Sequence, residues 1–401
     1  MQVFEDALHR SGMVYNDPEL EARLYSLIPI EQLGEKAKGF RYRIYVLRDP
    51  ELNAMIAPTG TIYINSGLLA ALEDMDQLRL VIGHEAHHLI DQDIVHYYQK
   101  IKNEVGAIKV LQLIAAPAVA VAIAESDSST AATIANVYTA ANLAVSITYQ
   151  ASVSGYGRDN ENECDQFALK IFKENSYDYR SARRVFQLFE EEEKRYAKGF
   201  QYHLFRTHDS GKKRADQVDQ FMKDHGYVEP VDPRPQDEYE ELTRKVRLEN
   251  ARLNIRIKRI QHALDGLGRL DRGRSGDPVV QFLYGEAYAA LASDDRILKD
   301  ELNSKEWRKL GIKDLKAQTV VWRNQALEYY RKAIELDVTY ADPHRGIALL
   351  KEGVGELQEA MDHYKRYLQI TPEPPDKRYV QAKIDRLTKK LATPVPTKEE
   401  K

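Results

Sequence analysis

An internal period of 34 residues in the C-terminal third of the chain is the feature that most restricts its fold. Four apolar or aromatic positions recur at this spacing: Ala326, Tyr330, Ile334 and Leu336 match Ala360, Tyr364, Leu368 and Ile370. Gly355 and Pro372 stand where a repeat of this length would break between helices. Units of this kind bury their apolar faces by stacking on one another. The sequence therefore predicts stacked helix pairs over residues 278–391.

The repeat resembles the tetratricopeptide repeat, whose unit is one helix pair of this length. The first helix of a preceding repeat is expected at 282–291, where Gly285 and Tyr288 have the usual spacing of the repeat. The alanine of its second helix is expected at 297, but the matching residue is Ala326. This shift predicts an insertion near 293–321. We expect a solvated helical connector at 231–277 that can carry one apolar stripe, and 244–277 within it is a candidate degenerate first repeat. We also expect a capping helix at 379–391 and a disordered tail at 392–401.

The first 230 residues have the pattern of a separate α+β domain. Residues 1–40 read as helical, with Asp17 as a helix cap and Pro18 at the first helical position. Segments 41–47 and 61–65 are rich in β-formers, and Pro58 and Gly60 mark a turn between them. This pattern predicts a small antiparallel sheet. Apolar residues return to helical spacing from about residue 76 to 102.

Composition excludes several classes of protein. The net charge of −4 argues against a nucleic-acid partner, and an apolar content of 43% is enough for a sizeable core. The single cysteine, Cys164, excludes an intrachain disulfide. The start of the chain carries acids rather than a basic, then apolar, leader. This pattern predicts no signal peptide in the sequence. Either the protein is cytosolic, or the sequence is that of a mature chain whose leader is missing.

Residues 110–157 contain only two charged side chains, Glu125 and Asp127, and so require a test for membrane insertion. The first apolar run, 110–124, is shorter than the roughly 20 residues that a spanning helix needs. The second run is longer but rich in Ser, Thr, Asn and Gln. We therefore expect a buried or lid-forming helical hairpin here, with a membrane-touching segment as the alternative.

The stretch His84-Glu85-Ala86-His87-His88 is an H-E-x-x-H motif within the 76–102 helix. Residues four apart on a helix lie on one face, so His84 and His88 can direct imidazole nitrogens at one zinc ion. Glu85 then projects beside the metal as a general base. His87 is expected to pack or to hydrogen-bond behind a ligand. The motif predicts a zinc hydrolase site with one Zn²⁺ per chain.

Zinc needs a third protein ligand, and Arg158 to Ala168 offers acidic candidates on a second predicted helix. Glu161 and Asp165 are four residues apart and share a face. Glu161 can bind the metal while Asp165 accepts the far ring N–H of a ligand histidine. Glu163 is expected to be solvated. Cys164 is expected to be a small buried residue, with a ligand role as the lesser alternative.

Several segments together resemble one family of zinc metallopeptidases, to which the heat-shock protease HtpX, the CAAX prenyl protease and the periplasmic protease BepA belong. The resemblance rests on NAMIAPTG at 53–60, IYI at 62–64, SGLL at 66–69, the HEAHH motif and the E-x-x-x-D pair at 161–165. It extends to THDSGKKR at 207–214, where Asp209 replaces the usual proline. The repeats point to the BepA-like branch. A zincin-type protease domain at 1–230, mostly helical with a small sheet, is the fold that this implies.

The resemblance also implies roles for residues outside the motif. His208 would face the site and donate to the developing oxyanion, and Arg214 would support the site from behind. An edge strand for extended substrate is expected from Asn53, Ala54, Met55, Ile56 and Ala57. Relatives in this branch work in the bacterial periplasm or at its membranes, so a periplasmic or membrane-associated location is expected.

These observations predict a zinc-dependent endopeptidase that acts on unfolded or misassembled proteins. A zinc hydrolase that acts on non-peptide bonds is a further reading, but no feature of the sequence supports it. Its repeats would bind a protein partner or the substrate. The alternative is a chaperone or assembly module whose protease site is latent. In that case the segment 110–157 or His208 itself would cap the zinc at rest.

Overall fold

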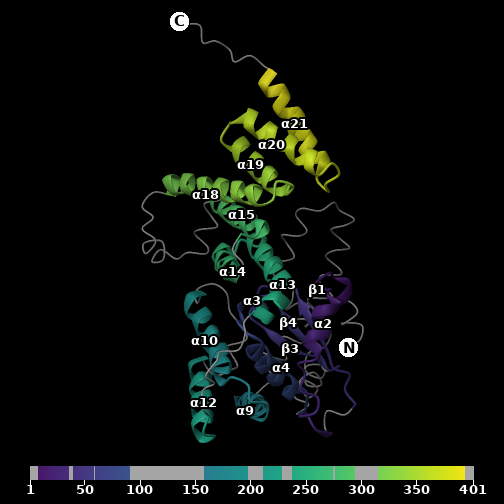
Figure 1. The fold of residues 1–401 in the computed structure, drawn as a ribbon, viewed down its shortest axis with the longest axis vertical. Helices are drawn as coiled ribbons and strands as arrows, with labels where there is room; N and C mark the ends of the chain where they lie inside the picture. The colour runs from purple at the N-terminus through teal and green to yellow at the C-terminus, as the bar shows by residue number, and fades with distance from the viewer. Residues whose placement is uncertain are drawn as a thin grey trace, which may run out of the picture. The chain divides into compact units, whose positions relative to one another are not determined.

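A computed structural model describes residues 8–35, 39–57, 59–90, 158–196, 211–227, 237–273, 276–293 and 315–392. The chain divides into two compact units, residues 1–250 and 251–401, whose elements are labelled in Figure 1. The division falls inside one helix, after Asn250, whereas the sequence analysis placed domain limits at 230 and 278. Each unit is described by itself below.

The first unit contains a four-stranded sheet with the order β1-β2-β4-β3. Its strands are β1 (Val14–Tyr15), β2 (Arg43–Leu47), β3 (Ala54–Ile56) and β4 (Thr61–Asn65). β1 pairs antiparallel with β2, and β3 pairs antiparallel with β4, but β2 and β4 run parallel. The prediction of an antiparallel sheet is therefore wrong for its central pair, and the sheet is mixed.

The predicted turn at Gly60 is present, but it does not join the two predicted strands 41–47 and 61–65 to each other. It belongs to the hairpin from β3 to β4, where Gly60 has a φ of +92° that favours glycine. The chain leaves β2, crosses past β4 to form β3, and turns back into β4. The central strands therefore run in the same direction, which the two β-rich segments alone could not reveal.

The N-terminal 40 residues are helical over only part of their length. Helix α2 (Pro18–Tyr25) begins as predicted, with Pro18 in its first turn and the Asp17 side chain accepting a hydrogen bond from the Leu20 N–H. The uniform helical reading of 1–40 is wrong, because Val14 and Tyr15 form β1. Two residues are too few for strand periodicity to show in the sequence.

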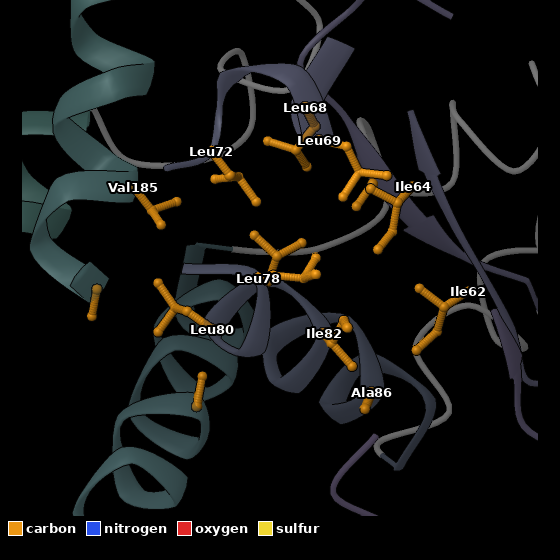
Figure 2. Packing of buried hydrophobic residues seen from close by; sticks show 14 of the residues in the cluster. Ile62, Ile64, Leu68, Leu69, Leu72, Leu78, Leu80, Ile82, Ala86 and Val185 are labelled. Carbon is orange, nitrogen blue, oxygen red and sulfur yellow. The ribbon is translucent and has the colours of Figure 1, made fainter. Parts of the chain in front are cut away.

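The core of the first unit lies between the sheet and its helices. The helices are α3 (Ser66–Ala71), α4 (Met75–Ile90), α9 (Arg158–Asn175), α10 (Tyr179–Tyr196) and α12 (Gly211–Asp224). Figure 2 shows Ile62 and Ile64 of β4 facing Leu78 and Ile82 of α4, with Val185 of α10 on the other side of α4. All five residues of β4 are buried, so this strand lies inside the core. α4 is thereby held at the centre of the unit.

Helix α13 (Asp237–Arg256) spans the division between the units. Up to Asn250 it is no solvated connector, because Tyr239, Thr243 and Val246 are fully buried against the first unit. The Tyr239 hydroxyl donates to the Leu69 carbonyl over 2.7 Å. The helix and the single apolar stripe expected in this polar, highly charged segment are both present, and the stripe packs into the core of the first unit.

The second unit consists of helices packed in neighbouring pairs. They are α14 (Ile260–Gly273), α15 (Pro278–Ser293), α18 (Leu315–Leu336), α19 (Asp342–Gly353), α20 (Leu357–Ile370) and α21 (Lys377–Ala392). α15 packs on α18, α19 packs on α20, and α21 follows where the capping helix was predicted. The matched positions Ala326, Tyr330, Ala360 and Tyr364 are buried on α18 and α20.

Two glycines allow the Tyr330 ring to lie between helices. A Cβ atom added to Gly285 of α15 would come within 2.4 Å of this ring, and one added to Gly346 of α19 within 2.5 Å. A ring that is 1% exposed cannot move aside freely. Side chains larger than hydrogen are therefore excluded at these two points of the helix stack.

We expect Gly285→Ala to lower the free energy of unfolding by roughly 1–3 kcal/mol, because the new methyl group overpacks the Tyr330 ring. Gly266→Ala is the matched control, since Gly266 lies in α14 with no atom within 4 Å of an added Cβ. There the helix propensity of alanine should raise stability by up to about 1 kcal/mol. Urea denaturation of both variants measures the difference. Equal effects would contradict the close packing.

Some predicted features lie outside the described residues. These are Pro58, the second part of the 76–102 helix, the 110–157 hairpin, His208, residues 294–314 of the insertion, and 393–401 of the tail. Within the described part of the chain, no helix is both long enough and apolar enough to cross a membrane.

Candidate zinc site

Helices α4 and α9 bring three potential metal ligands together. His84 and His88 lie one turn apart on α4, and their Nε2 atoms are 3.2 Å apart. Glu161 on α9 places Oε2 3.3 Å from the Nε2 of His84 and Oε1 3.6 Å from the Nε2 of His88. All three side chains are buried. Their ligand atoms lie within 4.8 Å of one another, as in a metal site.

These distances fit a tetrahedral zinc ion. Zinc bonds of about 2.0–2.1 Å to nitrogen and oxygen separate neighbouring ligand atoms by about 3.3–3.4 Å. Two imidazoles and one carboxylate form a donor set that catalytic zinc takes, with one coordination position left open. The residues present therefore fit the metal that the motif predicted.

Asp165 stands behind His84. Its Oδ1 accepts a hydrogen bond from Nδ1 of His84 over 2.9 Å. Arg214 on α12 donates to both oxygens of Asp165, over 2.7 Å and 2.6 Å. This ion pair is buried, and the Arg214 side chain holds the pKa of Asp165 below its usual range despite the opposing effect of burial. The anionic carboxylate fixes the ring so that Nε2 faces the metal position.

The two carboxylates next to His84 favour a positive charge at its ring. Burial lowers the pKa of His84, but hydrogen bonds with Asp165 and Glu161 outweigh burial and raise it to about 10. The two carboxylates thus draw one positive charge to this point, either a proton or a metal ion. Because ligation requires a neutral imidazole, metal binding must release that proton.

Gly211 sets the position of Arg214. A Cβ atom at Gly211 would lie 2.5 Å from the Phe186 carbonyl oxygen, so only glycine lets α12 begin this close to α10. Arg214 follows one turn later, with its guanidinium 4.3 Å from the centre of the Phe186 ring. Gly211 was not recognised from the sequence, although it lies inside the 207–214 segment. A glycine at the first position of the predicted helix could have indicated a close approach of that helix to a neighbouring element.

Cys164 is a buried helix residue, as expected, and it also contacts two histidines at the site. Its Sγ lies 3.3 Å from Nδ1 of His88 and 3.3 Å from Nδ1 of His87. The buried thiol therefore lies on the Nδ1 side of His88, whereas Nε2 of this ring faces the metal position. His87 packs on the Phe167 ring at 4.6 Å between centroids. The signal was present, since Cys164 follows Glu161 by three residues and shares its helical face.

Glu85 lies next to His84 on α4 and lines a small cavity with it. Burial raises the pKa of Glu85, and the nearby charge of Glu161 acts in the same direction, while His88, His84 and Arg214 act against it. A raised pKa suits a carboxylate that must accept a proton and then return it. Glu85 remains partly exposed to solvent.

The predicted substrate strand, Asn53 to Ala57, contains β3, the last strand in the sheet order. Its register places the N–H and C=O groups of Ala54 and Ile56 away from β4, where an added strand would pair. However, Met55 and the other residues of this segment are all buried. A peptide could therefore pair with this edge only after the atoms that bury it move away.

Glu163 is exposed on α9, in keeping with the solvated role expected for it. His208 lies outside the described residues, so its proposed contact with the site is not part of this geometry. The structure thus brings together His84, Glu85, His88, Glu161, Asp165 and Arg214.

Comparison with known proteins assigns the chain to a family. The model of Peptidase family M48 matches residues 15–221, more than half of the chain. The chain belongs to this family of zinc metallopeptidases. The predicted enzyme class and zinc cofactor are thereby confirmed.

The chain is also similar to two proteins named metalloendopeptidase OMA1, mitochondrial. The one from Bos taurus is 30% identical over 71 residues, which are 18% of this chain and 14% of that protein. The one from Danio rerio is 29% identical over 93 residues, 22% of this chain and 19% of that protein. The chain thus spans less than a fifth of the length of these curated relatives.

Proposed function

We propose that the protein is a zinc-dependent endopeptidase that cleaves unfolded or misassembled proteins. The observation that carries this proposal is the convergence of His84, His88 and Glu161 at tetrahedral spacing, with Glu85 beside them. The similarity to proteins named metalloendopeptidases supports internal cleavage of a chain.

The chain's own residues would act as follows. Zinc, when bound, polarises a carbonyl as a Lewis acid and makes a coordinated water more acidic. Glu85 accepts a proton from the attacking water and delivers it to the nitrogen of the leaving amine. Asp165, itself held by Arg214, keeps the His84 ring in place during turnover. His208 is proposed to donate a hydrogen bond to the oxyanion.

Protein quality control in the bacterial envelope is the proposed setting, in the manner of the BepA-like branch. Support comes from the 34-residue period and from the paired helices of the second unit, which resemble tetratricopeptide repeats. Stacked helix pairs of that type commonly present a surface for a protein partner or peptide. A periplasmic or membrane-associated location remains part of this proposal.

Removal of zinc tests the proposal. We expect the full chain to bind one zinc ion and to cleave casein, an unfolded substrate. A strong chelator should abolish cleavage, because His84, His88 and Glu161 then hold no metal, and stoichiometric zinc should restore it. Metal analysis and gel electrophoresis of casein digests provide the measurements. Full cleavage in metal-free protein would contradict the proposed mechanism.

The chaperone or assembly module predicts a different outcome of the same experiment. Zinc would bind, but casein would stay intact at every zinc concentration, and any cleavage would be independent of Glu85. Suppression of casein aggregation by the intact chain would then support the module in place of the peptidase.

A further inference from the structure

A small apolar cavity lies beside the proposed general base. Its volume is about 40 Å³, and its described lining includes His84 and Glu85. Most of the remaining walls are apolar side chains from α3, α4 and α10, namely Leu68, Leu80, Val81, Val185, Phe186 and Phe189. Ala54 of β3 also contributes to the wall. The cavity therefore adjoins both the metal position and the end of the predicted substrate strand.

The cavity meets the surface at the base itself. Among its described lining residues, Glu85 is the one that is not buried. A substrate carbonyl placed for attack next to Glu85 has a side chain within a few ångströms on either side of the scissile bond. One of these side chains would lie at the opening of the cavity.

Apart from Glu85, which the mechanism needs for proton transfer, the charged groups of the described walls are already paired with each other. Arg214 and Asp165 reach the lining, but each already forms the two hydrogen bonds of their buried ion pair. A further charge placed here would be taken from water without a free opposite charge, which is costly. The occupant should therefore be apolar.

The volume limits the size of the occupant. A cavity volume of about 10–15 Å³ is enough for one water molecule, and a cavity of about 150 Å³ accepts benzene. A cavity of 40 Å³ lies between these values and has room for a few carbon atoms. It fits the side chain of alanine or valine, is tight for leucine, and excludes aromatic rings.

We infer that this cavity is a specificity pocket that selects substrates with a small aliphatic residue directly beside the scissile bond. The inference rests on the proposed peptidase function and adds the substrate class. It makes the α10 residue Val185 a specificity-determining residue, although the motifs of the sequence do not include it.

Cleavage-site profiling tests the inference on the full, zinc-loaded chain. A library of unstructured peptides is digested, and mass spectrometry determines the residues on both sides of every cut. We expect alanine and valine to be enriched on one side, and Phe, Trp, Asp and Lys to be depleted there. Synthetic peptides that differ only at this position should show at least a tenfold lower kcat/KM for Phe than for Val.

Val185→Ala enlarges the pocket by two methyl groups and should shift the preference toward leucine and larger residues. The leucine-to-valine ratio of kcat/KM should rise by about tenfold. Val218→Ala is the matched control, because Val218 is equally buried in the same core but does not line the cavity. This control should leave the ratio unchanged even where it lowers stability.

A binding measurement provides a readout without turnover. Fluorescence anisotropy of labelled, uncleaved peptides on zinc-loaded Glu85→Gln protein should give the same order of affinity, with valine above phenylalanine. Absence of Glu85-dependent cleavage in the wild type would overturn the proposed function, and this inference with it. Cleavage with no size preference on either side of the bond would overturn the pocket alone, whether or not the variants fold.

Discussion

Glu85→Gln should abolish peptide hydrolysis while leaving zinc bound. Loss of a general base typically lowers the rate by about 10²–10⁴-fold, and Glu85 is the carboxylate placed beside His84 for this task. Zinc content should match the wild type, because the ligands are His84, His88 and Glu161. The melting temperature should stay equal or rise slightly, since the raised pKa of Glu85 shows that its environment disfavours the charged form.

Kinetics on a fluorogenic peptide, with zinc measured in the same samples, would check this expectation. Glu174→Gln is the matched control, because Glu174 is an exposed carboxylate on α9 away from the ligand atoms. It should retain full activity. Wild-type turnover in Glu85→Gln would exclude Glu85 as the base, and loss of zinc in this variant would make it a ligand instead.

Glu161→Ala should cause the largest loss of zinc. The change removes one of three protein ligands and leaves two histidines, which hold zinc far more weakly than a complete site. Glu163→Ala is the control, because Glu163 lies two residues away on the same helix but is exposed. Titration of zinc-loaded protein with a chromogenic chelator measures retention in both.

Asp165→Asn should fall between the wild type and Glu161→Ala. Asp165 holds His84 from behind, and partners of this kind change metal affinity or activity by about 10–100-fold. The asparagine would also leave Arg214 buried without its anion. If Glu161→Ala retained zinc as well as the wild type, the third ligand would be another residue, with Glu163 or Cys164 as the next candidate.

The site was largely predictable because its information is local. His84, Glu85 and His88 lie within five residues, and helical geometry alone places them on one face. Glu161 and Asp165 follow from the same rule on a second helix. What local rules cannot supply is the approach of one helix to another, which here depends on close contacts such as that of Gly211 with the Phe186 carbonyl.

The sheet shows the opposite case. The predicted segments 41–47 and 61–65 contain β2 and β4, but the prediction of antiparallel pairing was wrong, because strand pairing depends on contacts between distant residues. The three residues of β3 are uniformly buried, so alternation does not mark them as a strand, and the edge strand expected at 53–57 came from the family resemblance instead. For α13, the sequence indicated a helix with one apolar stripe, but it could not show that the stripe packs into the core of the first unit.

The pairing of α15 with α18 bears on how this protein can change in length. Ser293 and Leu315 end and begin these helices, whereas α19 and α20 are joined across only Val354 to Glu356. Loop-closure entropy grows only with the logarithm of loop length, so each doubling of a flexible connection costs roughly 0.6 kcal/mol. The contact of Tyr330 with Gly285 is made between the helices themselves. The packing of α15 on α18 therefore does not set the length of chain between Ser293 and Leu315, and an engineer could add a reporter there at a modest cost in stability.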